Sequence, residues 1–322
     1  MYKRQHDSVP IGKDEKTNKE VENWQPETGL NKNSRDHIEL SEKNNLVDLE
    51  RASKISGSRF YFLKNSLVRM NYALIAFALD YISKKGYAML QPPYLMNRKP
   101  MSGAVILSDF EEVIYKIEDQ DLYLIGTSEH ALAAMHSEEI FSKEDLPRKY
   151  VSVSPCFRKE AGSHGRDTKG IFRVHQFEKV EIFSITDPKS SWTQHEEILE
   201  DVKQFYKELE IPYRVMLLSS GDMSKVASKT FDIEAWLPGQ NNYRELVSCS
   251  NCTDFQSRRL GIKYRNKPHE ESILTHTLNS TLTATERTLI AILENFQNED
   301  GSITIPRALR TYMNNQKEIV AT

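Results

Sequence analysis

The chain has 322 residues, of which 39% are hydrophobic and 28% are charged, a balance typical of a globular protein with much polar surface. Its 43 Lys and Arg against 46 Asp and Glu give a formal net charge of -3, so any nucleic-acid partner would have to be held by a local basic patch. No apolar run approaches the roughly 18 residues of a membrane span, no leader peptide is recognisable, and three cysteines do not make a disulfide framework, so the sequence predicts a cytoplasmic protein without a membrane partner.

The composition and hydrophobic pattern of the chain change after its first 45 residues. Residues 1–45 are polar and rich in Lys, Glu and Asn, which predicts largely irregular structure with short strands at most. Apolar residues then recur at helical spacing, and the helix they predict would bury Leu67, Met70, Leu74, Phe77 or Ala78, and Ile82. Gly86 follows two lysines and is a good helix stop, after which "YAML" and "QPPYL" predict a strand that reaches a proline-marked edge.

The rest of the chain alternates between helical and strand-like segments. Thr127 and Ser128 precede "EHALAAMH", which predicts a helix with a hydroxyl cap. Residues 192–209 and "ATERTLIAILENFQ" have helical periodicity, whereas the strand-like runs are "KYVSVSPCF", "YRVMLLSS", "FDIEAWL", "YRELVSC" and "SILTHTLNST". Helices mixed with many short strands predict an α+β domain built on a mostly antiparallel sheet.

Residues 157–183, "FRKEAGSHGRDTKGIFRVHQFEKVEIF", contain two alternating runs around a polar, glycine-punctuated turn. Alternation would pair Arg158 with Glu160 on one strand face. On the second run it would align Arg173, His175, Phe177, Lys179 and Glu181, with Phe172, Val174, Val180 and Ile182 facing the other way. Cations, an aromatic ring and a carboxylate on one face would suit a nucleotide beside an amine, although each charged residue taken alone is more often a solvated surface group.

The same stretch carries a resemblance to a known family. "FRKE", a loop and "FRVHQFEKVEIF" resemble motif 2 of class II aminoacyl-tRNA synthetases, and residues 160–181 are very close to the seryl-tRNA synthetases. "KKGYAMLQPPYL" resembles motif 1, and "TLNSTLTATERTLIAILENFQ" resembles motif 3 with Arg287 as its arginine. "GTSEHALAAMH" and "ELVSCSNCTDFQSRR" are also similar to seryl-tRNA synthetase segments, so the resemblance runs in order from about residue 6 to residue 313.

The resemblance implies a fold, a domain plan and a reaction. The fold would be the class II antiparallel sheet flanked by helices, paired into a homodimer through motif 1. Residues 1–5 would be a leader foreign to the family, 6–322 the catalytic domain with 6–45 as its lead-in, and the N-terminal tRNA-binding arm of the family would be absent. The reaction would be serine–tRNA ligation: ATP and Mg²⁺ activate L-serine as seryl-adenylate, and the seryl group passes to the 3' end of tRNA(Ser), with tRNA(Sec) as a further acceptor. Transfer to tRNA would be impaired without the arm.

The resemblance also implies two sets of binding residues. Those for ATP are Arg158, Lys159, Glu160, Arg173, Val174, Phe177, Glu245, Leu246, Val247, Ser248 and Arg287. Those for serine are Thr127, Ser128, Glu129, Arg158, Glu181, Asn279 and Thr281. Glu245 and Ser248 would also hold Mg²⁺, and because they lie three apart on a strand, a bulge or a strand end would have to bring them to one face.

Individual roles follow from the same resemblance. Arg158 would bridge the α-phosphate and the serine carboxylate, and Arg173 would hold the γ-phosphate. Adenine would lie between Phe177 and Arg287, with its amino group on Glu160. No side chain has to act as a nucleophile, because the serine carboxylate attacks phosphorus directly and catalysis is positioning plus neutralisation of phosphate charge.

Alternative interpretations attach to single features of the sequence. Cys249 and Cys252 have the spacing of a zinc half-site, but Cys156 is the one remaining cysteine, so structural thiols and no zinc are expected. Glu286 stands where the family resemblance predicts a small or hydroxyl residue, and it could pair with Arg287 or point away from it. An arm-less relative that loads amino acids onto carrier proteins would need a cysteine-ligated metal. A silent paralogue would be expected to lack the key charged residues, and Arg158, Arg173, Glu181 and Arg287 are all present.

Overall fold

An eight-stranded sheet forms the centre of the computed structural model, which describes residues 5–106, 112–160 and 169–320. In spatial order its strands are β1 (Lys19–Trp24), β10 (Tyr213–Leu217), β11 (Lys229–Leu237), β12 (Asn242–Thr253), β15 (His276–Ala284), β9 (Gln176–Thr186), β8 (Arg148–Phe157) and β4 (Ala88–Leu90). All neighbours are antiparallel except β4, which runs parallel to β8 at the edge. The predicted α+β fold on a mostly antiparallel sheet is therefore confirmed.

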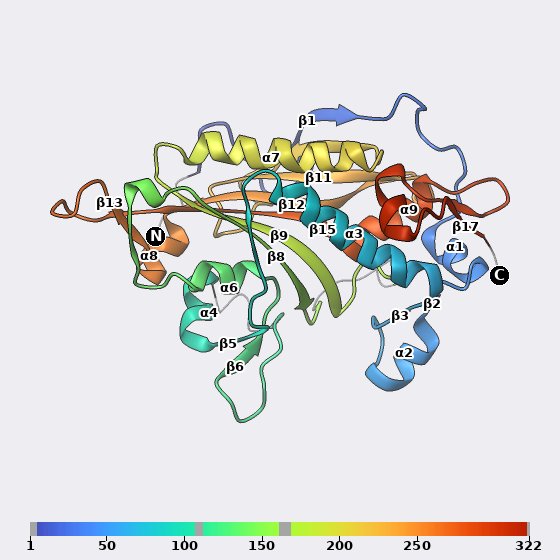
Figure 1. The fold of residues 1–322 in the computed structure, drawn as a ribbon, viewed down its shortest axis with the longest axis horizontal. Coiled ribbons are helices and arrows are strands. Elements are labelled where there is room, and N and C mark those ends of the chain that lie inside the picture. Colours follow the sequence, from blue (N-terminus) through green and yellow to red (C-terminus); the bar gives the residue numbers. More distant parts are fainter. Residues whose placement is uncertain (1–4, 107–111, 161–168, 321–322) are drawn as a thin grey trace.

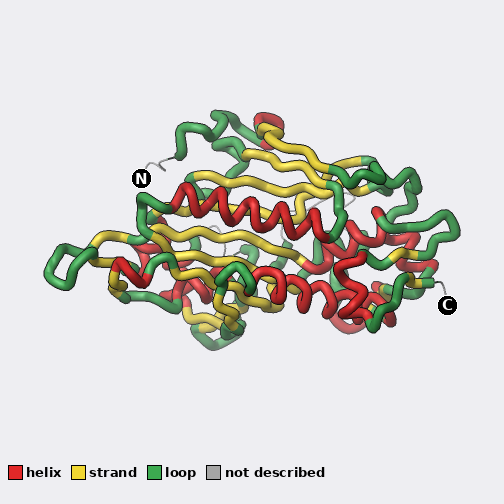
Figure 2. The backbone as a smooth tube through the Cα atoms, turned by 45° about the horizontal axis from the view of Figure 1, so that its top comes forward, coloured by secondary structure: helices red, strands yellow, loops and turns green. Residues whose placement is uncertain are grey.

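One face of the sheet is covered by helices. α3 (Asn65–Ser83), α7 (Ser191–Glu208) and α9 (Thr285–Asn295) lie along it (Figures 1 and 2). α3 buries the predicted apolar side chains, and Gly86 follows it in a left-handed conformation with φ 84°. The described residues include no helix with the length and hydrophobicity needed to cross a membrane.

The side chains of the central strands alternate between this helix-covered face and the opposite face. On β9, Val180 and Ile182 pack into the main core, whereas Lys179 and Glu181 point to the other side. On β15, Leu278 joins the core and Asn279 faces away from it. The polar residues of the central strands therefore collect on a single face.

Smaller elements border the polar face. The helices α4 (Arg98–Ala104), α6 (Glu129–Ala134) and α8 (Phe255–Leu260) pack with a second hydrophobic cluster below the sheet (Figure 1). Short strands flank them: β5 (Leu95–Asn97) with β6 (Leu122–Leu124), and β7 (Ile140–Ser142) with β13 (Lys263–Arg265) and β14 (Ile273–Leu274). These elements leave a cavity between themselves and the polar face of the sheet.

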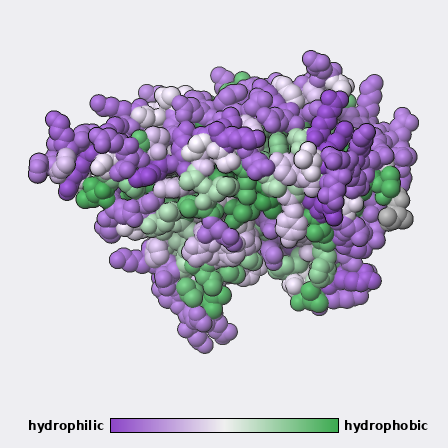
Figure 3. Space-filling model, viewed as in Figure 1, coloured by the Kyte–Doolittle hydropathy of each residue, from purple (hydrophilic) through white to green (hydrophobic). Residues whose placement is uncertain are grey.

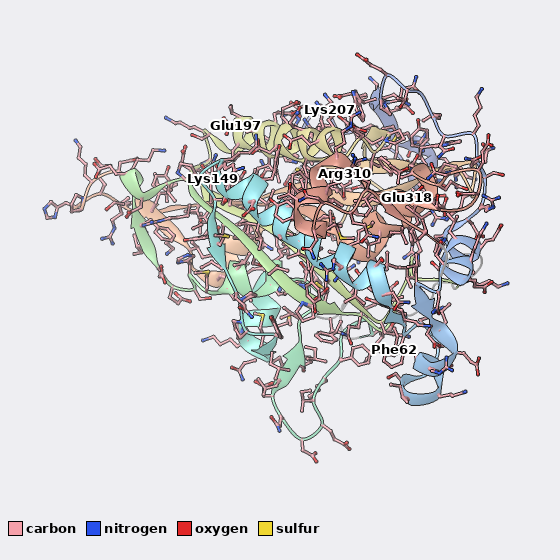
Figure 4. The ribbon with its side chains drawn as sticks, turned by 45° about the vertical axis from the view of Figure 1, so that its right-hand side comes forward. Phe62, Lys149, Glu197, Lys207, Arg310 and Glu318 are labelled. Carbon is pink, nitrogen blue, oxygen red and sulfur yellow. The ribbon has the colours of Figure 1, made fainter. Side chains whose placement is uncertain are left out.

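The remaining elements lie at the periphery. They are the helices α1 (His37–Lys43) and α2 (Leu49–Ser56), the strand pairs β2 (Val47–Asp48) with β3 (Phe62–Leu63) and β16 (Ile303–Thr304) with β17 (Glu318–Ile319), and the 3-10 turns η1 (Glu15–Thr17), η2 (Lys143–Asp145) and η4 (Arg307–Met313). Figure 4 shows Phe62 on the projection that carries α2, away from the sheet, with Lys149 and Glu197 on the far side of the molecule. Residues 6–45 supply the edge strand β1, a short strand of the kind that the sequence allows, and also the helix α1, which the sequence pattern did not predict.

The strands around the polar turn are shorter than the sequence pattern predicts. β8 ends at Phe157 and β9 begins at Gln176, so residues 158–160 and 172–175 lie outside the ladder. One further backbone bond, from the amide of Arg158 to the carbonyl of His175 at 2.9 Å, closes this end, and Glu160 takes a positive φ of 47°. The predicted alternation of Phe172 and Val174 away from Arg173 is therefore wrong, because these residues belong to a turn.

Candidate active site

A cavity of about 470 Å³ lies on the polar face of the sheet, between the ends of β8 and β9, the strands β12 and β15, and the start of α9. The sequence-predicted residues that line it are Thr127, Glu129, Arg158, Glu160, Arg173, Val174, Phe177, Glu181, Glu245, Leu246, Ser248, Asn279, Thr281 and Arg287. Segments more than 150 residues apart in the chain thus converge on a single chamber that contains both acidic and basic side chains.

Arg158 is fixed at the point where β8 ends. Its Nε donates to the carbonyl of Gly126 at 3.0 Å, and its guanidinium carbon lies 5.3 Å from the centre of the Phe177 ring. Bonding through Nε orients the planar fork, so the terminal nitrogens can reach anionic groups in the cavity. Arg173 adds a second cation, 3.6 Å from the carboxylate of Glu160.

Arg287, at the start of α9, is held by Glu245 on β12. Its Nη1 donates to the Glu245 carbonyl at 3.1 Å and lies 3.3 Å from the Glu245 carboxylate. The guanidinium carbon lies 4.9 Å from the centre of the Phe172 ring, and Arg244 approaches the same ring at 4.4 Å. Phe172 therefore lines the cavity beside Phe177, although the strand pattern predicts that it faces the opposite side.

A β-bulge brings Glu245 and Ser248 to the same face of β12. The pairing with β11 shifts between Ile233 and Glu234, so Leu246 is the extra residue on β12. Burial raises the pKa of Glu245, but the nearby guanidinium groups of Arg287, Arg158 and Arg173 outweigh it and lower that pKa. The carboxylate is thus ionised over a wide pH range.

Asp232, which the sequence patterns did not single out, lies opposite Ser248 on β11. Burial and the nearby carboxylate of Glu245 raise the pKa of Asp232, and its Oδ1 is shielded from solvent without a hydrogen-bond partner among the described residues. An orphaned carboxylate oxygen next to Glu245 and Ser248 is a donor set that suits a hard divalent cation.

The other end of the cavity holds two carboxylates and short polar side chains. Glu181 is 1% exposed, pairs with Lys179 at 2.6 Å and accepts from the Thr281 hydroxyl at 3.3 Å. Glu129 accepts from Asn279 Nδ2 at 3.1 Å, and burial, reinforced by the charge of Glu181, raises the pKa of Glu129 to about 7. Lys179 is a member of this site that the sequence placed on the correct face but did not assign.

Three sequence-predicted residues lie outside the cavity lining. Val247 faces the main core, the Lys159 Nζ lies 5.9 Å from the centre of the Tyr115 ring, and Ser128 is fully buried at the start of α6. The predicted hydroxyl at this helix start comes from Thr127, whose Oγ1 accepts from the amide of Glu129 at 3.3 Å, and not from Ser128.

Glu286 points away from the Arg287 guanidinium. Its carboxylate accepts from the amide of Glu178 at 3.1 Å, from the Thr285 hydroxyl at 3.2 Å and from the Tyr61 hydroxyl. It is 2% exposed, and burial raises its pKa to about 7. Glu286 therefore connects the start of α9 with β9 and with the segment before α3, which no sequence pattern indicated.

Two cysteines and two histidines could suggest a metal or an acid–base site. Cys249 lies in the main core, whereas Cys252 lines the cavity on the other face of β12, so the two thiols do not face a common centre. His175 Nδ1 lies 2.9 Å from the Arg158 carbonyl, and His276 Nδ1 lies 2.8 Å from the Ser191 hydroxyl. His164 falls outside the described residues.

Comparisons of the chain with known proteins identify its family. The family model described as "tRNA synthetase class II core domain (G, H, P, S and T)" matches residues 114–296. The chain is 60% identical over 314 residues to a serine–tRNA ligase of Nitrosopumilus maritimus, covering 98% of this chain and 75% of the relative. A serine–tRNA ligase of Methanospirillum hungatei is 52% identical, with 97% and 74% covered.

Solved structures give the same family. Seryl-tRNA synthetase from Pyrococcus horikoshii, solved in complex with ATP, superposes with a TM-score of 0.95 at 48% identity, covering 99% of this chain and 75% of that one. Cytoplasmic serine–tRNA ligase from Naegleria fowleri, solved with AMP, gives 0.92 at 44% identity, with 99% and 76% covered. The chain therefore belongs to the seryl-tRNA synthetases, the serine–tRNA ligases among the class II aminoacyl-tRNA synthetases.

Proposed function

We propose that the cavity binds ATP and L-serine together and joins them as seryl-adenylate. The observation that carries this proposal is the division of one chamber into a cationic, aromatic end with Arg158, Arg173 and Phe177, and an acidic end with Glu129 and Glu181. A triphosphate and an adenine ring suit the first end, and an ammonium group and a hydroxyl suit the second. The relative from Pyrococcus horikoshii, solved with ATP, supports the assignment of the nucleotide.

In the reaction, the serine carboxylate attacks the α-phosphorus of ATP, the new carboxyl–phosphate bond forms, and pyrophosphate leaves. The charge of Arg158 lowers the pKa of both Glu129 and Glu245, so its guanidinium is near both ends of the cavity and would hold both the carboxylate and the α-phosphate. Arg173 would bind the γ-phosphate, Phe177 and Arg287 would contact adenine, and Glu160 would accept from its amino group. The contribution of the protein is alignment and charge neutralisation, and no side chain becomes covalently modified.

Glu245 and Ser248 are the residues that we propose hold Mg²⁺. The bulge at Leu246 puts both on the cavity face, and the orphaned oxygen of Asp232 lies next to them. When bound, the cation would neutralise phosphate charge and align the leaving group. The carboxylate of Glu245 and the hydroxyl of Ser248 supply oxygen donors, as a hard cation requires.

Selection of serine would rest on its hydroxyl. Glu181, Thr281 and Asn279 offer polar partners for a hydroxyl at the buried end of the cavity. Alanine would leave these groups without a partner, and a site built to bond a hydroxyl rejects the analogue that lacks it strongly.

The direct test is ATP–pyrophosphate exchange with serine, threonine, alanine and glycine. Exchange that depends on serine alone is expected. Equal exchange with alanine would contradict the proposed recognition of the serine hydroxyl. Absence of exchange in a folded chain that still binds ATP would favour a relative that has lost catalytic activity.

We propose that the second step transfers the seryl group to the 3' end of tRNA(Ser), and also of tRNA(Sec). The exposed basic residue Lys169 would contact the acceptor end of the tRNA, and Arg166, which we propose for the same role, falls outside the described residues.

We also propose that two copies pair through motif 1. Tyr72 on α3 and Met89 on the edge strand β4 are 63% and 61% exposed, and Val68 lies one turn before Tyr72. Figure 3 shows hydrophobic residues gathered in the middle of this face of the molecule. Exposed apolar side chains beside an open sheet edge are typical of a subunit interface.

Tyr72→Glu is expected to shift the protein from dimer to monomer, because a charge would be buried in the apolar contact. Light scattering after gel filtration measures the mass. Ile11→Glu is the matched control, since Ile11 is also a large exposed hydrophobic residue, 93% exposed, but lies in the lead-in before β1. A monomeric wild-type chain would rule out this interface.

A further inference from the structure

Gln256 is a fully buried amide that lies behind the amino-acid end of the cavity. It belongs to α8, which packs against α4 and α6 in the second hydrophobic cluster (Figure 1). Gln256 is 0% exposed and is not part of the cavity lining, so it cannot touch a substrate directly.

Both polar atoms of the Gln256 side-chain amide form hydrogen bonds. Its Nε2 donates to Glu129 Oε1 at 2.8 Å and to the Ala104 carbonyl at 3.1 Å, and its Oε1 accepts from the Thr277 hydroxyl at 2.6 Å. A donor on one side and an acceptor on the other leave a single orientation of the amide that satisfies every partner. Nε2 is therefore directed at the carboxylate of Glu129.

Glu129 is the carboxylate on which this arrangement acts. Gln256 and Asn279 both donate to its Oε1, which leaves Oε2 available for a group inside the cavity. Asn279 itself lines the cavity, so binding of a substrate can change its partners, whereas Gln256 is sealed behind α6 and keeps its bond. Gln256 is thus the permanent support of the Glu129 carboxylate.

We propose that Gln256 is a positioning residue of the amino-acid pocket, which holds the Glu129 carboxylate in the one orientation that presents Oε2 to the amino-acid substrate. This inference rests on the proposed binding of serine next to Glu129. The hydrogen-bond partners of Gln256 are Glu129, Ala104 and Thr277, and none of these is a proposed ATP residue, so Gln256 affects the amino acid and not the nucleotide.

The hydrogen bond also affects the charge of the pocket. Burial raises the pKa of Glu129 and Glu181 raises it further, whereas Lys179, Gln256 and Arg158 oppose them. Removal of the Gln256 side-chain donor would raise the pKa of Glu129 further. A higher pH would then be needed to ionise Glu129 so that it can bind a substrate ammonium. The charges on Glu181, Lys179 and Arg158 stay in place in such a variant.

The test is Gln256→Met, which keeps the volume and removes the donor. We expect the KM for serine to rise by about tenfold to a hundredfold, the loss typical of a hydrogen bond to a charged group. The KM for ATP should stay within about twofold, and the midpoint of the pH profile of serine binding should move upward. Gln297→Leu is the matched control: Gln297 is also buried and donates to two carbonyls, Arg35 and Glu294, away from the cavity.

A second variant covers the case in which Gln256→Met does not fold. Thr277→Val removes the hydroxyl that orients the amide and keeps the shape, and it should raise the KM for serine by a smaller factor. Unchanged KM values for serine in a folded Gln256→Met chain, or equal rises for serine and ATP, would overturn the inference. Titration with a non-hydrolysable seryl-adenylate analogue separates the failure of the proposed function from the failure of this inference. If the wild-type chain neither exchanges nor binds the analogue, both the proposed function and this inference are overturned. If the wild-type chain exchanges normally and the kinetics of Gln256→Met are unaltered, this inference alone is overturned.

Discussion

Arg158→Lys is expected to lower serine-dependent ATP–pyrophosphate exchange by about 100-fold to 1000-fold, the range found when a preorganised charge-stabilising group is removed. Arg158 uses Nε to bind the Gly126 carbonyl and still has terminal nitrogens for the cavity. Lysine is a point charge on a flexible stem and cannot keep the carbonyl bond while it also bridges a carboxylate and a phosphate. The loss should appear mainly in kcat, because the bridging contact is strongest in the transition state.

Arg148→Lys is the matched control for this experiment. Arg148 begins the same strand, β8, but forms an exposed ion pair with Asp145 at 2.7 Å outside the cavity. Exposed pairs contribute little, so exchange and thermal stability should both stay close to wild type. Exchange by Arg158→Lys within about threefold of wild type would show that the guanidinium fork is not part of the transition state, since such a change is far below the effect of losing a charge-stabilising group.

The parts of the site that could be predicted are those carried by regular strands. Alternation on β9 separates Lys179 and Glu181 from Val180 and Ile182, and the structure confirms both faces. The bulge that the spacing of Glu245 and Ser248 requires is present at Leu246. A period of two is a local property of the backbone, so it can be read without knowledge of the tertiary structure.

The parts that could not be predicted depend on contacts between distant segments. The alternating pattern continues through residues 172–175, but the strand does not, because its partner β8 ends at Phe157. Gln256 meets Glu129 across 127 positions, and Tyr61 meets Glu286 across 225. No spacing rule covers such pairs, since each depends on how α6, α8 and α9 pack on the sheet.

The same long-range packing determines what Glu286 does. Glu286→Ala is expected to lower the free energy of unfolding by about 2–4 kcal/mol at pH 5, because the buried Tyr61 hydroxyl and the Glu178 amide would lose their acceptor and a cavity would form. Since Glu286 fixes α9 against β9, Arg287 and Phe177 should lose their alignment, and kcat/KM for ATP should fall by about tenfold. Urea unfolding and exchange kinetics measure the two effects.

Comparison with Tyr61→Phe shows whether the two side chains act as one unit. Tyr61→Phe removes the hydroxyl that donates to Glu286 and keeps the ring. The double variant should be less destabilised than the sum of the single variants, because either change alone already breaks the bond between them. Additive losses would mean that Glu286 acts independently of the segment before α3.

The pH dependence gives a third measurement on Glu286, with a definite sign. The carboxyl has an ordinary pKa of 4.5, and burial raises its pKa to about 7 in the folded protein. The folded state therefore binds the proton on Glu286 more tightly than the unfolded state does. The contribution of Glu286 to the free energy of unfolding of the wild-type chain should fall as the pH rises from about 4.5 to about 7. Glu129 titrates in the same range, but it is present in both chains and cancels in the comparison. The stability deficit of Glu286→Ala should thus be largest at and below about pH 4.5 and shrink as the pH rises toward 7. A deficit that grows with pH would mean that the three donors favour the ionised carboxylate more than burial opposes it.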